Sequence, residues 1–224
     1  MTARVLIVED HALVAIGLQL ALSARGWEVE TTDGPTADAV VEHAKRFEPQ
    51  CVLLDIGLGE TVGSGIDLVG PLRATGAEIV MLTAENRRTV LAACLEAGAA
   101  GWLCKDAFLD QVVAALEDVL ARRPLIGCGA REALLDELRI ERAGQRRALS
   151  PFEQLTVRER RVLAALVDGM SAEEIADAHF VALTTVRTQI RAVLQKLGVR
   201  SQLAAVAAAN RVGWKLDDDE LAAA

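Results

Sequence analysis

The chain has 224 residues, of which 52% are hydrophobic and 25% are charged, and its formal net charge is −8. No apolar run reaches the roughly 18 residues of a membrane helix, and residues 1–8 are too short for a signal peptide, so we expect a cytoplasmic protein without a membrane partner. The four cysteines show no CxxC pair and no ligand spacing with histidine, which favours buried thiols over disulfides or a metal site.

The charge is unevenly distributed along the chain. Residues 1–123 hold 18 acidic and 10 basic side chains, whereas residues 124–224 hold 14 of each. Residues 155–211 are locally basic, with 8 basic and 5 acidic side chains. An acidic first part and a locally basic second part indicate two tasks, the second of them with a polyanionic partner.

Strand and helix patterns alternate five times over residues 1–123. Strands are predicted at 3–8, 28–32, 51–54, 78–82 and 100–103, and helices at 11–25, 34–47, 66–74, 86–97 and 108–122. A glycine-rich loop follows the third strand. This alternation predicts an α/β domain in which helices cover both faces of a five-stranded parallel sheet.

Polar side chains follow four of the five predicted strands: Glu9 and Asp10, Asp55, Thr83, and Lys105. Right-handed crossovers bring the carboxyl ends of parallel strands to one rim, where ligands bind in open α/β sheets. Each of these residues taken alone can be a simple turn former. If these residues were only turn formers, four strands would have to end in polar residues by coincidence. We therefore favour a common site.

The chemistry of this rim is that of phosphoryl transfer. Three carboxylates brought together repel one another, and a hard divalent cation such as Mg²⁺ relieves the repulsion. Asp55 can then act as a nucleophile toward phosphorus and form an aspartyl phosphate. The Lys105 ammonium can neutralise the phosphoryl oxygens, and the Thr83 hydroxyl can hydrogen-bond one of them.

These residues resemble the receiver domain of two-component response regulators. The run from Glu96 to Lys105, Glu-Ala-Gly-Ala-Ala-Gly-Trp-Leu-Cys-Lys, is similar to the fifth-strand signature of that family. The resemblance implies a flavodoxin-like fold for residues 1–123. It assigns the phosphoacceptor Asp55, the Mg²⁺ ligands Glu9, Asp10, Asp55 and the Gly57 carbonyl, the phosphoryl-binding Thr83 and Lys105, and the switch aromatic Trp102.

The chain departs from the receiver pattern in two places. The loop after Asp55 lacks the usual proline and is longer than in the family, which affects its rigidity and the rate of dephosphorylation. Trp102 replaces the commoner tyrosine or phenylalanine, so a larger ring would have to move, and a plain core or surface tryptophan is the alternative. No residue that the phosphoryl chemistry requires is missing.

Residues 124–151 form a predicted linker. Apolar residues at 134, 135, 138 and 140 predict a short amphipathic helix over 130–142, and the polar stretch 143–151 reads as a solvated hinge. The sequence leaves open whether this helix packs on either domain or on a second subunit.

Residues 152–212 show a purely helical pattern. Thr156 with Glu159 and Ser171 with Glu174 form two predicted capping boxes. Helices are expected at 156–167, 171–179, 184–197 and 201–211. A tight turn between the second and third helices, with bases on the third, indicates a helix-turn-helix, although the spacing alone fits any four-helix unit.

This segment resembles the LuxR-type DNA-binding domain through Leu155-Thr-Val-Arg-Glu-Arg-Arg-Val-Leu163, Gly169-Met-Ser171, Thr185-Val-Arg187 and Lys196-Leu-Gly-Val-Arg-Ser201. Together with the receiver, it identifies the chain as a member of the NarL/FixJ-type response regulators, whose third helix reads the major groove. The predicted DNA contacts are Thr184, Thr185, Arg187, Thr188, Gln189, Arg191, Lys196 and Arg200, the last two toward phosphates. Plain surface solvation is the alternative for each cation.

The resemblance implies a transcriptional regulator that is not an enzyme. A sensor histidine kinase would phosphorylate Asp55, and the modified chain would bind promoter DNA as a homodimer. Leu203 and Val206 lie on a helix face of small residues that could pair with another copy. Residues 213–224, which include the acidic run 217–220, are predicted to be disordered.

Two other classes of function remain open. The first is an enzyme. A flavodoxin-like protein would need a phosphate-binding loop where Glu9 and Asp10 stand, and an aspartyl-phosphate phosphatase would need a second acid at the position of Gly57. The other class is a receiver that works only through protein contacts, its helical domain having lost DNA binding.

Overall fold

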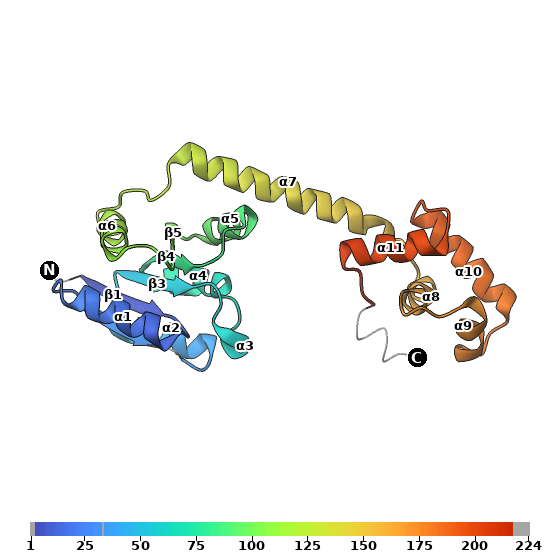
Figure 1. Cartoon of the computed structure of the whole chain (residues 1–224), viewed down its shortest axis with the longest axis horizontal. Helices are drawn as coiled ribbons and strands as arrows, with labels where there is room; N and C mark the ends of the chain where they lie inside the picture. The colour runs from blue at the N-terminus through green and yellow to red at the C-terminus, as the bar shows by residue number, and fades with distance from the viewer. Residues whose placement is uncertain (1–2, 33, 217–224) are drawn as a thin grey trace. The chain divides into compact units, whose positions relative to one another are not determined.

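The computed structural model describes residues 3–32 and 34–216, and the chain divides into two compact units after Arg139 (Figure 1). The first unit combines strands and helices, and the second is helical. Within the described ranges, no helix combines the length and apolarity that a membrane crossing requires.

A five-stranded parallel sheet forms the centre of the first unit. Its strands are β1 (Arg4–Val8), β2 (Glu28–Thr32), β3 (Cys51–Asp55), β4 (Glu78–Thr83) and β5 (Gly101–Cys104). They lie in the order β2-β1-β3-β4-β5, and all neighbouring pairs are parallel. The predicted α/β architecture is confirmed, with each strand within one residue of its expected bounds.

Helices cover both faces of the sheet, because successive residues of a strand point to opposite sides. The helices that cover it are α1 (Ala12–Ser23), α2 (Ala37–Phe47), α4 (Gly65–Arg73), α5 (Arg88–Ala97) and α6 (Leu109–Leu120). Leu6 and Ile79 are buried under α2, α4 and α5, and Val5 and Val80 are buried under α1 and α6. The sheet is therefore doubly wound, and its carboxyl edge stays open for a site.

The glycine-rich loop after Asp55 is more ordered than the sequence indicated. It contains a one-turn helix, α3 (Gly59–Val62), and a bridge between Gly57 and Ser64 closes its base. Gly65 packs so tightly against the end of β3 that a side chain there would collide with the Asp55 carbonyl oxygen. Four residues are too few to show a helical period, so α3 was not predictable from the pattern.

The expected short linker helix and polar hinge are replaced by one continuous helix, α7 (Cys128–Glu153). The prediction of a solvated hinge over 143–151 is therefore wrong. A polar stretch is not by itself a loop, because alanine, glutamine, arginine and leucine are good helix formers. Gly144 is a single weak position inside the helix, and Pro151 lies close to its end.

Four further helices form the second unit: α8 (Val157–Val167), α9 (Ala172–Ala178), α10 (Leu183–Lys196) and α11 (Gln202–Val212). Val162, Ile175, Val186 and Ile190 are buried between α8, α9 and α10. Both capping boxes are confirmed. The Thr156 and Ser171 hydroxyl oxygens accept hydrogen bonds from the backbone N–H groups three residues on, and the glutamate carboxylates there accept from the Thr156 and Ser171 backbone N–H groups. The four predicted helices are all found.

The predicted disordered tail is partly ordered. Trp214 stacks on Phe152 with ring centroids 5.8 Å apart and joins the cluster around Leu163 and Val193. The prediction is therefore wrong for Trp214, whose apolar ring finds a partner at the end of α7. Residues 217–224, which carry the acidic run, lie outside the described residues.

Candidate phosphoacceptor site and nucleic-acid interface

Three charged side chains from three different strands meet at the carboxyl edge of the sheet. Lys105, just after β5, places its Nζ 2.8 Å from Asp55 Oδ2 at the end of β3 and 2.9 Å from Glu9 Oε1 after β1. Asp55 and Glu9 are buried, whereas Lys105 is half-buried. The structure thus brings together three of the residues that the strand ends predicted to converge.

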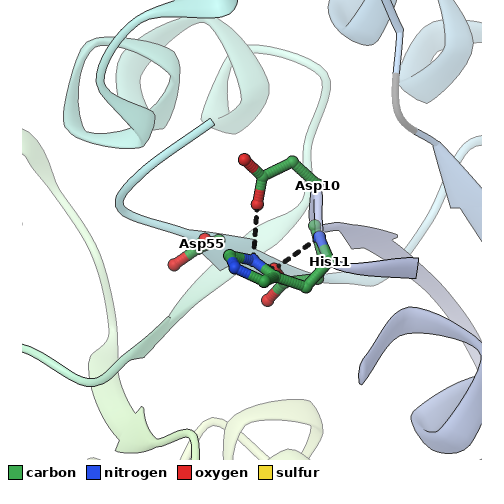
Figure 2. Close-up of side chains that lie close together, drawn as sticks. Asp10, His11 and Asp55 are labelled. Carbon is green, nitrogen blue, oxygen red and sulfur yellow. Dashed lines mark hydrogen bonds and ion pairs between the residues drawn. The ribbon is translucent and has the colours of Figure 1, made fainter. Parts of the chain in front are cut away.

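Four potential metal ligands gather beside this ammonium group. One ligand atom each from Glu9, Asp10, His11 and Asp55 lies within 4.8 Å of the others. Figure 2 shows the Asp10 and His11 side chains turned toward each other, with Asp55 alongside. Glu9 Oε2 is buried, and no donor among the described residues reaches it with hydrogen-bonding geometry, although Lys105 Nζ is 2.7 Å away. A buried acceptor in an acidic cluster fits a divalent cation.

His11 belongs to this cluster, and the sequence reasoning missed it. Its Nδ1 lies 2.8 Å from Glu9 Oε1 and 2.7 Å from Asp10 Oδ1, and its backbone N–H donates to Glu9 Oε1 at 3.0 Å. The hydrogen bond that the His11 ring donates to the Glu9 carboxylate raises the pKa of His11 above its ordinary value. Its place directly after the two acids was the available signal, but a side chain next to a helix start can point in several directions.

Burial and charge act against each other on the central pair. The pKa of Asp55 is raised above its ordinary value, mainly by burial and also by the negative charge of Glu9. The hydrogen bonds from Lys105 and from the Gly57 backbone oppose this shift without cancelling it. Burial alone would lower the pKa of Lys105, but Asp55 and Glu9 together raise it. The ammonium group is therefore firmly charged, and a further cation would favour the ionised Asp55.

Thr83 ends β4 at the carboxyl edge of the sheet, and Trp102 lies within the neighbouring strand β5. The buried Thr83 hydroxyl oxygen accepts a hydrogen bond from the Glu85 backbone N–H at 2.8 Å. Trp102 is half-buried and contacts two apolar clusters, one beneath α4 and α5 and one between α5 and α7. The roles of both residues stay predictions, but the contact of Trp102 with α7 was not foreseen.

The first part of α7 is docked on α5 by buried leucines. Leu134 and Leu138 are each 5% exposed and pack against Ala92 and Leu95. Their spacing of four residues puts them on one face of the helix. The partner of this face, which the sequence left open, is therefore α5 within the first unit.

Polar contacts flank the leucines. The Arg131 guanidinium donates to the Leu95 carbonyl at 2.8 Å and to the Ala99 carbonyl at 3.3 Å. These carbonyls lie near the C-terminal end of α5, where a cation is favourable. Arg88 and Glu137 form a two-bond ion pair at 2.7 and 2.8 Å.

The recognition helix expected from the sequence is α10. Its apolar residues Val186, Ile190 and Val193 are buried. The remaining positions turn a polar face outward, which the predicted contacts Thr184, Thr185, Arg187, Thr188, Gln189 and Arg191 occupy, all of them exposed except the half-buried Gln189. Arg200, also exposed, follows the helix.

Two of the predicted DNA contacts already have acidic partners. Arg187 lies 3.1 Å from Glu173, an exposed pair that solvent screens. Lys196 donates to Glu159 Oε2 at 2.6 Å and to the Gln154 carbonyl at 3.1 Å. Lys196 is thus engaged inside the domain, and its contact with a phosphate stays a prediction.

Comparisons with known proteins cover nearly the whole chain. Residues 5–117 match the response regulator receiver domain, and residues 153–209 match the luxR family of bacterial regulatory proteins. The chain is 33% identical to the transcriptional regulatory protein MctR of Rhizobium johnstonii, over 88% of this chain and 87% of the relative. It is 32% identical to the nitrate/nitrite response regulator protein NarP of Escherichia coli, over 90% and 92%.

A solved structure extends the likeness to three dimensions. The two-component response regulator of the LuxR family from Aurantimonas sp. SI85-9A1 aligns with a TM-score of 0.51 and 25% identity, over 64% of this chain and 99% of that one. The two family matches together account for both domains and their order. The chain belongs to the NarL family of response regulators, which are phosphorylation-dependent transcription regulators.

Proposed function

We propose that Asp55 accepts a phosphoryl group from a sensor histidine kinase and that this modification controls dimerisation and promoter binding. The observation that carries the proposal is the Lys105 ammonium, which bridges Asp55 and Glu9 at the sheet edge. An Asp55 oxygen forms the bond to phosphorus while the bond to the kinase histidine nitrogen breaks. Lys105 then lies beside the charge that develops on the phosphoryl oxygens.

The acidic side of the site suits Mg²⁺. Glu9, Asp10 and Asp55 would supply carboxylate oxygens, and the Gly57 carbonyl is the fourth proposed ligand. The buried Glu9 Oε2, which lacks a donor of good geometry among the described residues, supports this assignment. A bound Mg²⁺ would add positive charge beside the phosphoryl oxygens. His11, which contacts both acids, would hold their side chains in place.

The modification would be read out through the contacts of Thr83. Its hydroxyl can donate to a phosphoryl oxygen while its oxygen keeps the hydrogen bond from Glu85. A shift of Thr83 would then move the segment that leads into α5. Trp102 and α7 both pack on α5. The shift caused by a charge of about −1.5 to −2 on Asp55 would therefore be transmitted to α7 through packed side chains.

The second unit would bind double-stranded DNA with the outward face of α10. The buried Val186 and Ile190 fix which side of the helix faces outward. Arg187 can make two hydrogen bonds to a guanine, and Gln189 can bond a base edge. Because its proposed partner is chromosomal DNA, we place the protein in the cytoplasm.

Labelling with acetyl phosphate or a cognate kinase tests the acceptor. Asp55→Asn is expected to abolish formation of an acyl phosphate on the chain, since an amide is no nucleophile toward phosphorus. Asp67→Asn, which changes an exposed acid of α4 outside the site, is expected to label like the wild type. Mass spectrometry locates the group, and a phosphoryl group retained by Asp55→Asn would contradict the assignment.

A further inference from the structure

Phe180 lies in the turn between α9 and α10, where neither packing nor backbone accounts for an aromatic residue. Its side chain is 96% exposed. Its φ is +52°, in the left-handed region that residues with a Cβ atom avoid. The chain therefore holds an apolar ring in water on a backbone conformation that disfavours it.

Three other helices of the same domain end in the same hydrogen-bonding motif and use glycine there. Gly169 follows α8 with φ +86°, Gly198 follows α10 with φ +66°, and Gly213 follows α11 with φ +64°. In all four turns the residue at positive φ donates to a carbonyl three residues back, and the next residue donates to one five residues back, at 3.3 and 3.0 Å for Phe180 and Val181. Since glycine makes this turn without strain, the phenylalanine needs another explanation.

Phe180 also lines a surface hollow of about 530 Å³. The other residues around it are Arg158, Arg161, Ala178, His179, Val181, Thr185 and Gln189. The two arginines come from α8, and Thr185 and Gln189 belong to the proposed groove-reading face of α10. An aromatic ring, two cations and two base-reading side chains thus share one concave surface, which is a suitable composition for binding a DNA strand.

We infer that Phe180 contacts DNA and packs against the 5-methyl group of a thymine at the edge of the major groove. The inference rests on the proposed DNA-binding function. The thymine methyl is the apolar group that base pairs present in that groove, and phenylalanine is among the side chains that pack on it. Arg158 and Arg161 would hold neighbouring phosphates, and the ring would become buried only in the complex.

Phe180→Gly separates recognition from folding. It removes the ring and relieves the left-handed strain, so the melting temperature is expected to stay the same or rise. With the full chain carrying beryllofluoride and a duplex obtained by random-site selection, we expect Kd to increase about five- to tenfold. Phe180→Asn, which tolerates positive φ but is polar, is expected to weaken binding similarly. Val157→Ala, an exposed apolar residue outside the hollow, is expected to keep wild-type affinity.

Single replacements of thymine by deoxyuridine in that duplex identify the contact, because they remove only the methyl group. The wild type is expected to lose about five- to tenfold in affinity at one thymine of each half-site, and Phe180→Gly to lose none there. Equal affinity of the wild type and Phe180→Gly, or equal discrimination between thymine and uracil by both, would overturn the inference. The exposed ring would then be assigned to contact with a protein partner. If the wild type selects no duplex at all, the DNA-binding proposal fails and this inference with it.

Discussion

Lys196 was predicted to contact a DNA phosphate, but in the structure it forms an ion pair within the domain. Its position suggested a phosphate contact, yet its ammonium bonds Glu159 at 2.6 Å. Glu159 also receives the Thr156 backbone N–H of the capping box at 2.7 Å. The pair therefore ties the end of α10 to the start of α8, which holds the recognition helix on its support.

This pair predicts a pH dependence of the second unit. Burial alone would raise the pKa of Glu159, but the hydrogen bonds from Lys196 and Thr156 outweigh it, so the pKa lies below its ordinary value of 4.5. A carboxyl group whose pKa is lowered by folding stabilises the native state above its unfolded pKa, and this stabilisation is lost as the pH falls through the folded pKa. We therefore expect the wild type to lose more stability between about pH 7 and about pH 3 than Glu159→Gln, which keeps the capping box.

Thermal unfolding of the second unit across this pH range is the measurement. Glu153→Gln is a suitable control, because Glu153 is an exposed acid at the end of α7. Its pH profile is expected to follow that of the wild type. Parallel profiles for the wild type and Glu159→Gln would show that the pair with Lys196 does not carry the effect.

At the level of elements, α7 is held on α5 by buried leucines and by an exposed ion pair, and the two differ in strength. Arg88 and Glu137 are 62% and 45% exposed, so solvent and salt weaken their attraction. Leu134 and Leu138 are buried, so their removal leaves a cavity as well as lost apolar contact. The leucines should therefore dominate the docking.

We expect Leu138→Ala to lower the free energy of unfolding of the first unit by about 2–3 kcal/mol, and Glu137→Gln by less than about 1 kcal/mol. Urea unfolding measures both values, and hydrogen exchange in α5 is expected to rise only in Leu138→Ala. Equal losses for the two variants would mean that the ion pair positions α7.

For the whole molecule, the proposed readout is assembly. Beryllofluoride mimics the acyl phosphate at Asp55, and we expect it to double the mass of the wild type in light scattering while leaving Asp55→Asn unchanged. Leu203, which is 79% exposed on α11, is a candidate contact between copies, so Leu203→Ser is expected to weaken the dimer. An unchanged mass of the wild type with beryllofluoride would contradict control of assembly by Asp55.

Much of the fold was predictable because it is encoded locally. Apolar runs and helical periods located all five strands to within one residue, and Thr156 and Ser171 marked two helix starts through pairs three residues apart. The convergence of Asp55 and Lys105 followed from topology, since parallel strands joined by right-handed crossovers end at one edge. Such features need only neighbouring residues or a general rule of connection.

The sequence by itself determined the α/β sheet, the helical domain and the residue types that meet at the sheet edge. Only the tertiary structure decided that α7 runs unbroken and packs on α5, that His11 turns toward Glu9 and Asp10, and that Lys196 pairs with Glu159. The physical reason is that a helical period shows which face of a helix is apolar but not which distant surface will bury it. A charged side chain likewise selects its partner only after packing has placed the candidates within reach.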